Sequence, residues 1–201
     1  MPSPDQTRKR SLNSAVFNIP NTLTFLRILA VPVLLILIHG HHTRRDEFWA
    51  AILFGSAFFT DLFDGWIARR TQSITRLGRV LDPVADKLIV VAALLLLIRL
   101  GRVDEVIAIL LLSRELVVSG LRDIAGHEGI LIASRASGKA KTMCEGFGLG
   151  FLLGGPGYAL FGVSLMSAGT WLVYGALVLA YWSAFFYFRA YFKSEPSHPS
   201  A

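Results

Sequence analysis

The stretch PVADKLIVVAALLLLIRL, at residues 83–100, decides the fold because its central part is an unbroken apolar run. A helix rises about 1.5 Å per residue, so about 20 apolar residues in helical form cross the hydrocarbon core of a bilayer. Five further apolar stretches of similar length lie near residues 20–39, 47–69, 104–122, 139–160 and 168–192. The sequence therefore predicts an all-α integral membrane bundle of six transmembrane helices.

The composition agrees with a membrane location. Of the 201 residues, 53% are hydrophobic, which gives more apolar surface than a soluble domain of this size buries. A net charge of +6 could indicate nucleic-acid binding in a soluble protein, but here the basic residues lie at helix ends and in loops, so no nucleic-acid partner is expected. The single cysteine, Cys144, cannot form a disulfide within the chain.

The distribution of basic residues predicts the orientation in the membrane. If the N-terminus is cytoplasmic, six spans return the C-terminus to the same side. The cytoplasmic segments then hold Arg8, Lys9, Arg10, Arg69, Arg70, Arg76, Arg79, Arg122, Arg135, Lys139, Lys141, Arg189 and Lys193. The opposite side keeps Arg44, Arg45, Arg99 and Arg102. This asymmetry follows the positive-inside rule and favours contact with anionic membrane lipids.

We expect one membrane domain over residues 19–193, flanked by two short segments. Residues 1–18 are either a short interfacial helix on the cytoplasmic surface or disordered, and no cleavable signal peptide is expected there. Pro20 suits the first turn of the first span, where its missing N–H costs little. The polar tail, residues 194–201, is expected to be disordered.

Two acidic pairs flank the connection between the second and third spans. The second span ends in DLFDGWIAR, residues 61–69, and helical spacing puts Asp61 and Asp64 on one face. The third span is expected to begin with Asp82 as N-cap and Pro83 at its first helical position. Asp86 then lies one turn further along the same face as Asp82.

A short connection makes these two spans antiparallel neighbours, so the four carboxylates should converge at the cytoplasmic edge of the membrane. Like charges that close are unfavourable at membrane depth, and a bound cation removes the repulsion. Hard oxygen ligands without a nearby histidine favour Mg²⁺ or Mn²⁺ over Zn²⁺, and two bridged ions suit phosphoryl transfer. The alternative is that these acids are helix caps or solvated loop residues.

Further polar and small residues suit a nucleotide. Asn21, Thr24 and Arg27 share one face of the first span near its cytoplasmic end, where they could contact a nucleotide or a diphosphate. The alternative for these three is a helix cap plus an arginine that snorkels to the membrane surface. Gly65 and Gly78 lack side chains, which lets such a ligand approach the backbone closely.

The spacing Asp61-x-x-Asp64-Gly65-x-x-Ala68-Arg69, followed after eight residues by Gly78-x-x-x-Asp82-x-x-x-Asp86, resembles the signature of the CDP-alcohol phosphatidyltransferase family. The resemblance runs from about Asn18 to Arg189. It implies a transferase of phospholipid biosynthesis in which an alcohol displaces CMP from a CDP-linked lipid.

The same resemblance implies roles for individual residues. Asp61, Asp64 and Asp82 would hold metal, and Asp86 would hold metal and also act as general base, a role that suits a carboxylate beside a metal-bound diphosphate. The cytidine diphosphate pocket would be lined by Gly65, Ala68, Arg69 and Gly78. A homodimer in the bacterial inner membrane is also expected from the resemblance.

The acceptor must be inferred from residues outside this signature. Arg114, Arg122, Lys139 and Lys141, in the fourth and fifth spans, form a basic cluster that suits the phosphate of a small anionic acceptor. The alternative is that Arg114 and Glu115 pair with other charges to hold helices together. These blocks resemble the branch of the family that uses sn-glycerol 3-phosphate with CDP-diacylglycerol. The acyl chains would lie in a lipid-facing groove between apolar helices.

Two other functions remain open from the sequence. A sister transferase would take inositol phosphate, serine or phosphatidylglycerol as acceptor, whereas a cation transporter would use the buried acids as an ion pathway.

Three further sequence features are not assigned to the site. The glycine-rich GFGLG at residues 146–150 is interpreted as close helix packing and not as a nucleotide loop. His39, His41 and His42 are interpreted as a solvated loop. The role of Glu145 stays open between an interhelical hydrogen bond and a polar group near the site.

Overall fold

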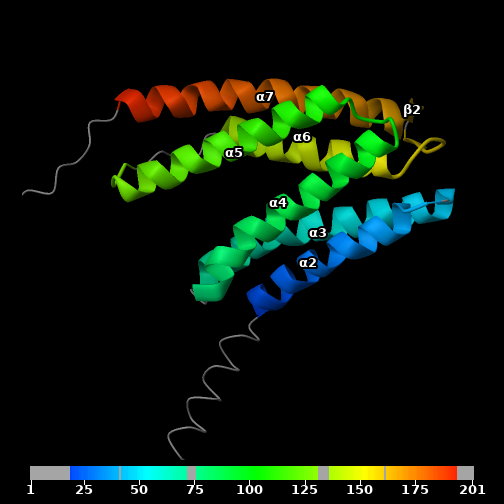
Figure 1. Ribbon diagram of the computed structural model, residues 1–201, viewed down its shortest axis with the longest axis horizontal. Helices are drawn as coiled ribbons and strands as arrows, with labels where there is room; N and C mark the ends of the chain where they lie inside the picture. Colours follow the sequence, from blue (N-terminus) through cyan, green and yellow to red (C-terminus); the bar gives the residue numbers. More distant parts are fainter. Residues whose placement is uncertain (1–18, 41, 72–75, 131–135, 161, 194–201) are drawn as a thin grey trace, which may run out of the picture. The chain divides into compact units, whose positions relative to one another are not determined.

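The computed structural model describes residues 19–40, 42–71, 76–130, 136–160 and 162–193. Over these residues the chain forms six helices and one short antiparallel hairpin (Figure 1). The helices are α2 (Ile19–Ile38), α3 (Arg44–Thr71), α4 (Arg76–Arg99), α5 (Glu105–His127), α6 (Ala136–Leu153) and α7 (Leu165–Lys193). The predicted helical class is confirmed. The expectations for residues 1–18 and 194–201 fall outside the described residues.

The start of α4 differs from the prediction. The helix begins at Arg76 and contains Pro83 in its interior, so the predicted N-cap at Asp82 is wrong. Residues 76–81 include the good helix formers Arg76, Leu77 and Arg79, which favour a helix before the proline. A proline inside a helix removes one backbone hydrogen bond and bends the helix axis, but the helix can continue on both sides of it. Pro83 is such an interior proline and does not mark the start of α4.

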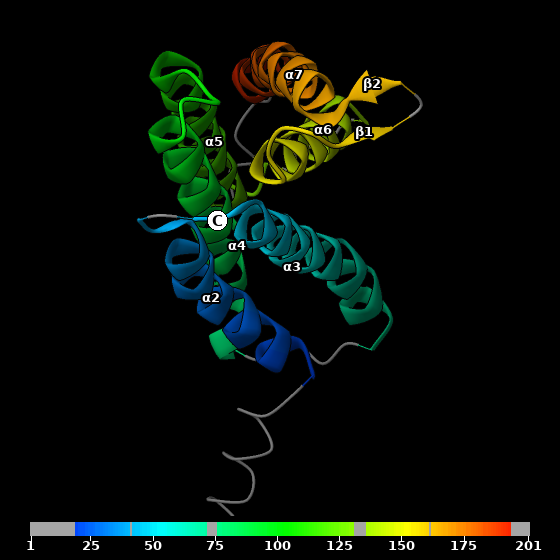
Figure 2. The ribbon, with the colours of Figure 1, turned by 90° about the vertical axis from the view of Figure 1, so that its right-hand side faces the viewer.

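The end of α6 is also earlier than predicted, at Leu153 instead of residue 160. Gly155 and Gly157 adopt positive φ angles of 78° and 97°, a conformation that ends a helix at little cost for glycine. The chain then forms β1 (Ala159–Leu160) and β2 (Val163–Ser164), with Ala159 opposite Ser164. This hairpin, which the sequence analysis did not expect, connects α6 to α7 (Figure 2).

The chain divides into two compact units, residues 1–96 and 97–201. In the first unit α2 packs beside α3, and Leu34, Ile38 and Phe54 are fully buried. In the second unit α7 packs on both α5 and α6, around the buried Leu111 and Leu149. Each predicted site residue can thus be described within one unit.

The contact between α6 and α7 depends on two glycines. A Cβ atom on Gly148 would lie 2.9 Å from Val173 Cγ2 and 3.1 Å from the Gly169 carbonyl oxygen. A Cβ on Gly169 would lie 3.0 Å from the carbonyl oxygen of Gly148. Small residues allow two helix backbones to approach closely in this way. The interpretation of GFGLG as a packing motif is therefore confirmed at Gly148.

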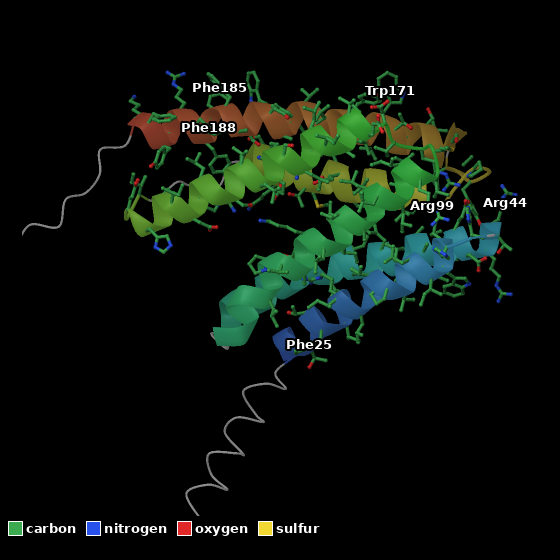
Figure 3. The ribbon with its side chains drawn as sticks, in the orientation of Figure 1. Phe25, Arg44, Arg99, Trp171, Phe185 and Phe188 are labelled. Carbon is green, nitrogen blue, oxygen red and sulfur yellow. The ribbon has the colours of Figure 1, made fainter. Side chains whose placement is uncertain are left out.

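Of the residues that the structure describes, α7 is the helix that is long and apolar enough to cross a membrane. The apolar part of α2, Thr22–Ile38, is shorter. Large apolar side chains project outward from α7, including Trp171, which is 74% exposed, and Phe185 (Figure 3). The six-span arrangement itself is considered with the proposed function.

Candidate active site

The predicted carboxylates lie on α3 and α4. Asp61 and Asp64 belong to the last turns of α3, and Asp82 and Asp86 lie in the first half of α4. Separations of three and four residues put each pair on one helical face. The structure does not describe the side chains of Asn21, Asp61, Asp64, Gly65, Ala68, Arg69, Gly78 and Asp82. Their convergence stays a prediction.

Asp86 is the predicted metal ligand whose side chain is described, and it forms an ion pair with Arg27. The guanidinium Nη1 of Arg27, on α2, donates to Asp86 Oδ1 on α4. Arg27 is 4% exposed, whereas Asp86 is 37% exposed. Thr24, one turn before Arg27, is buried as well. The structure thus brings together two residues that the sequence analysis assigned to one site from separate motifs.

The residues of this site fit a hard divalent cation. All four predicted donors are carboxylates, which Mg²⁺ and Mn²⁺ prefer over nitrogen or sulfur. Asp86 is partly exposed and already attracts a positive group, the guanidinium of Arg27. Among the described side chains, no group of three or more His, Cys, Asp or Glu residues is placed so that it could hold a metal ion. Three of the four predicted ligands lie outside that set.

A groove lies between α2 and α3 and reaches Arg27. Its volume is about 320 Å³. It is lined by Leu23, Leu26, Arg27, Leu29, Ala30, Val33, Leu53, Ser56, Ala57 and Thr60. Thr60 directly precedes Asp61, so the polar end of the groove adjoins the predicted metal site along the chain.

In the second unit, Arg114 joins α5 to α7. Its Nε donates to the Ala180 carbonyl oxygen at 3.0 Å, and its Nη2 donates to Ser183 Oγ at 2.5 Å. Nη1 pairs with Glu115 Oε2 at 3.1 Å. Arg114 is buried, so its donors are used to hold helices together. This was the alternative that the sequence left open for this residue.

Lys141 extends the same network to α6. Its Nζ lies 2.8 Å from Glu115 Oε2 and 2.5 Å from Glu145 Oε2. The network thus contains two cations, Arg114 and Lys141, and two carboxylates, Glu115 and Glu145, whose charges balance. Glu145 pairs with a lysine of its own helix, and through that lysine it is connected to Glu115 on α5. Buried charges need such partners.

Arg122 and Lys139 are the exposed members of the predicted acceptor cluster. Arg122 Nη2 donates to the Tyr187 hydroxyl at 3.2 Å, and the guanidinium carbon lies 5.4 Å from the centre of that ring. Lys139 lies in the first turn of α6. The four cations therefore divide into a buried pair and an exposed pair.

The sequence analysis missed two residues of the second unit. Tyr187, to which the sequence analysis gave no role, is buried and binds Arg122. Ser183 is buried and accepts a hydrogen bond from Arg114. Both partners lie more than 60 residues away in the sequence, so no local pattern indicates them. The spacing of Ser183 and Tyr187, one helical turn apart on α7, is the one signal that could have grouped them.

The histidine loop has a local explanation. His42 Nε2 lies 3.1 Å from Glu47 Oε1, at the start of α3, and Nδ1 lies 3.3 Å from the carbonyl oxygen of Gly40. His39 is exposed, and His41 is outside the described residues.

Comparison with known proteins decides the family. The sequence profile of the CDP-alcohol phosphatidyltransferases matches residues 17–182. The chain belongs to the CDP-alcohol phosphatidyltransferase family. The resemblance predicted from the spacing of the aspartates is thereby confirmed, and the matched segment includes α2 to α6 and most of α7.

Several members of this family are similar over most of the chain. A CDP-diacylglycerol-glycerol-3-phosphate 3-phosphatidyltransferase of Rickettsia typhi is 34% identical over 174 residues, 86% of this chain and 96% of the relative. The enzyme of the same name from Bacillus subtilis is 36% identical, with 65% of this chain and 73% of the relative covered. A probable phosphatidylglycerophosphate synthase of Mycobacterium tuberculosis is 38% identical, with 69% and 66% covered.

Proposed function

We propose that this chain transfers the phosphatidyl group of CDP-diacylglycerol to sn-glycerol 3-phosphate, giving phosphatidylglycerophosphate and CMP. The observation that carries the proposal is the complete family motif from Asp61 to Asp86, placed on α3 and α4 in a chain that matches the family over residues 17–182. The names of the similar enzymes from Rickettsia typhi and Bacillus subtilis support the choice of acceptor.

The proposed reaction is a displacement at phosphorus. The acceptor hydroxyl oxygen forms a bond to the β-phosphorus of the donor, and the bond from that phosphorus to the bridging oxygen breaks, so CMP leaves with the bridging oxygen. Asp86 accepts the hydroxyl proton. Asp61, Asp64, Asp82 and Asp86 would hold Mg²⁺ or Mn²⁺, as two ions, which neutralise the diphosphate charge when bound.

Arg27 supplies a cation to the donor side of this reaction. A guanidinium can donate two parallel hydrogen bonds to a phosphate, so Arg27 can contact the diphosphate and Asp86 in turn. Its contact with Asp86 supports a place in the donor site. The remaining donor contacts in the proposal come from Asn21, Thr24, Gly65, Ala68, Arg69 and Gly78.

The acceptor phosphate is assigned to the cluster of Arg114, Arg122, Lys139 and Lys141. Arg122 and Lys139 are the first candidates for direct contact because both are exposed. Arg114 and Lys141 are buried beside carboxylates, so they would have to exchange a partner to reach a phosphate.

The enzyme is further proposed to cross the bacterial inner membrane six times, with both termini and the active site on the cytoplasmic side, and to act as a homodimer. Outward-facing apolar side chains on several helices support the six spans. Examples are Leu29 on α2, Ile52 on α3, Leu95 on α4, Leu116 on α5 and Val178 on α7. A surface of this kind is stable against lipid and unfavourable in water.

CMP release tests the proposed function. The protein is purified in detergent with CDP-diacylglycerol and Mg²⁺, and glycerol 3-phosphate, serine, inositol phosphate and phosphatidylglycerol are each supplied separately. We expect release with glycerol 3-phosphate, and we expect Asp86→Asn to reduce it at least a hundredfold, the usual contribution of a general base.

Other outcomes have clear meanings. Release with a different alcohol would keep the chemistry and refute the acceptor. No release with any alcohol, from protein that remains folded, would refute the proposed activity.

A further inference from the structure

The two arginines of α5 have partners of different charge. Arg114 is buried, and one of its partners is the Glu115 carboxylate. Arg122 is exposed, and among the described residues its hydrogen-bond partner is the neutral hydroxyl group of Tyr187. A neutral partner does not cancel a positive charge. The guanidinium of Arg122 therefore keeps its attraction for an anion from solution.

Tyr187 contacts this guanidinium in two ways. Its hydroxyl oxygen accepts a hydrogen bond from Arg122 Nη2 at 3.2 Å, and the centre of its ring lies 5.4 Å from the guanidinium carbon. At that distance an aromatic ring attracts a cation. Arginine has several N–H donors, of which the hydroxyl accepts one. The contact thus restricts the guanidinium and leaves further donors for a ligand.

Tyr187 is itself held firmly by the packing of α5 against α7. It is 5% exposed, and it belongs to a cluster of buried residues at the interface of these two helices. The other buried members are Val118, Leu121 and Ala184, and the partly buried Phe188 and Tyr191 pack against them. A ring in such a cluster has little freedom to move, so it can fix an exposed side chain that contacts it.

This restraint favours the binding of an anion by Arg122. A long exposed side chain normally samples many rotamers, and a ligand that immobilises it loses affinity through the lost entropy. Where folding has already restricted the side chain, that loss is smaller when the ligand binds.

We propose that Tyr187 is a positioning residue for the acceptor, which holds the Arg122 guanidinium ready to bind the phosphate group of sn-glycerol 3-phosphate. The inference rests on the proposed function, which assigns that phosphate to the cluster containing Arg122. Tyr187 acts through Arg122 and does not itself have to touch the acceptor.

Tyr191 provides a matched control on the same helix. It lies one helical turn beyond Tyr187, and its hydroxyl donates to Glu128 Oε2, at the end of α5, at 2.9 Å. Both tyrosine hydroxyls thus join α7 to α5, but the partner of Tyr191 is a carboxylate that is not part of the acceptor cluster. Removing the Tyr191 hydroxyl tests the contact between the helices without changing Arg122.

The test compares Tyr187→Phe and Tyr191→Phe with wild type. Both variants keep the ring and lose the hydroxyl, and steady-state CMP release in detergent is measured with glycerol 3-phosphate and CDP-diacylglycerol varied in turn. We expect Tyr187→Phe to raise KM for glycerol 3-phosphate about three- to tenfold, which corresponds to the loss of one hydrogen bond. KM for CDP-diacylglycerol and kcat should change less than about twofold, because the interaction lost is one of acceptor binding. Tyr191→Phe should leave both KM values unchanged.

A double-mutant cycle with Arg122→Ala separates positioning from general stability. If Tyr187 acts through Arg122, adding Tyr187→Phe to Arg122→Ala should change KM for glycerol 3-phosphate by less than about twofold. A tyrosine that only stabilises the packing of α5 and α7 would instead raise this KM by the same factor in both backgrounds. Thermal unfolding of each variant accompanies the kinetics.

Several results would overturn the proposal. An unchanged acceptor KM in Tyr187→Phe would show that the hydroxyl does not prepare Arg122 for the acceptor. Equal increases in Tyr187→Phe and Tyr191→Phe, or an undiminished effect in the Arg122→Ala background, would assign the change to helix packing. These results leave the proposed function intact when wild type releases CMP with glycerol 3-phosphate, whereas no release from folded wild type with any alcohol refutes the proposed function itself.

Discussion

Arg27 is a buried cation that contacts the proposed general base, Asp86, from a different helix. The pair joins α2 to α4 within the first unit. A charge that is 4% exposed requires a partner of opposite sign, and a ligand diphosphate can serve as one as well as Asp86 can. In the proposed site, Arg27 would connect the state of Asp86 to the presence of the donor.

Replacement of Arg27 should weaken donor use more than acceptor use. We expect Arg27→Gln to lower kcat/KM for CDP-diacylglycerol about 10- to 100-fold, because a hydrogen bond to a charged group contributes about 1.5–3 kcal/mol. Arg27→Lys should recover part of this loss, since it keeps the charge but not the two-pronged geometry. The measurement is steady-state CMP release with each substrate varied.

The control for Arg27→Gln is Arg45→Gln, at an exposed position in the first turn of α3. An equal loss in both variants would contradict a specific role for Arg27.

The buried and exposed members of the basic cluster should respond differently to truncation. Arg114→Ala removes the buried guanidinium that joins Glu115 on α5 to the Ala180 carbonyl oxygen and Ser183 on α7, so we expect a loss of about 3 kcal/mol in the free energy of unfolding even though Glu115 keeps Lys141. Arg122→Ala removes an exposed guanidinium, so it should raise KM for glycerol 3-phosphate at least tenfold and change stability little. Thermal unfolding in detergent and acceptor titration separate the two effects.

An unchanged acceptor KM in Arg122→Ala, with the protein folded, would remove Arg122 from the acceptor site. An Arg114→Ala variant that is as stable as wild type and has a raised KM for glycerol 3-phosphate would indicate that Arg114 contacts the acceptor.

At this scale the sequence predicted residues with a fixed local spacing and assigned Arg27 and Asp86 to one site, but it missed the distant partners of Arg114 and Arg122. The motif from Asp61 to Asp86 is recognisable because three- and four-residue steps put its acids on helical faces. The bonds from Arg114 to Ser183 and from Arg122 to Tyr187 depend on how α5 meets α7. No pattern within one helix contains that information.

At the scale of the helices, the α6–α7 contact gives the sharpest expectation. Gly148→Ala should destabilise the protein by about 1–3 kcal/mol, because the added methyl group would lie 2.9 Å from Val173 Cγ2 and 3.1 Å from a backbone oxygen. The matched control is Gly175→Ala on α7, where an added Cβ meets nothing within 4 Å. That control should be neutral or slightly stabilising, since alanine favours helix over glycine. Thermal unfolding of wild type and of both variants measures these differences in stability.

The start of α3 is capped by three hydrogen bonds between Thr43 and Asp46. The Thr43 backbone N–H and hydroxyl donate to Asp46 Oδ2 at 2.8 Å and 2.7 Å, and the Asp46 N–H donates to Thr43 Oγ1 at 3.4 Å. The Thr43 backbone N–H, followed by its hydroxyl, lowers the pKa of Asp46 from its ordinary value of 3.8. This is a capping box, which satisfies donors at a helix N-terminus.

The lowered pKa of Asp46 predicts a pH-dependent cap. A carboxyl group whose pKa falls on folding stabilises the folded state above its ordinary pKa, and the stabilisation disappears as the pH drops through the lowered value. Asp46→Asn should therefore lower the unfolding midpoint at pH 7 and lower it less at about pH 3, which is below the ordinary pKa of the carboxyl group. Thr43→Ala should cost about 1 kcal/mol at neutral pH. An Asp46→Asn effect that is equal at both pH values would contradict a charged cap.

The existence of each helix was predictable, but several helix ends were not, and the start of α4 and the end of α6 differ most from the prediction. Long apolar stretches indicated α2 to α7 because a membrane helix must satisfy its own backbone hydrogen bonds. Pro83 and Gly155 were ambiguous signals, since proline can start or bend a helix and glycine can pack inside a helix or end it. The structure has Pro83 inside α4 and ends α6 before Gly155.

For the molecule as a whole, the proposal of six membrane crossings concerns the surfaces of all the helices. Of the described residues, α7 is the helix with the length and hydropathy of a span, yet exposed apolar side chains occur on α2, α3, α4 and α5 as well. Contact between so many exposed apolar side chains and water would be unfavourable. The composition alone predicted this surplus of apolar surface, whereas the two compact units around residue 96 had no signal in the sequence.

The proposed topology can be tested with single cysteines. In a Cys144→Ser background, Val163→Cys in the β1–β2 hairpin and His127→Cys at the end of α5 are both at exposed positions. Six spans with a cytoplasmic N-terminus put the hairpin outside and the end of α5 inside. A membrane-impermeant maleimide should therefore label Val163→Cys in intact spheroplasts and label His127→Cys only after lysis. Labelling of both before lysis would show that α6 does not cross the membrane, and labelling in the reverse order would invert the orientation and place the predicted aspartates away from the cytoplasm.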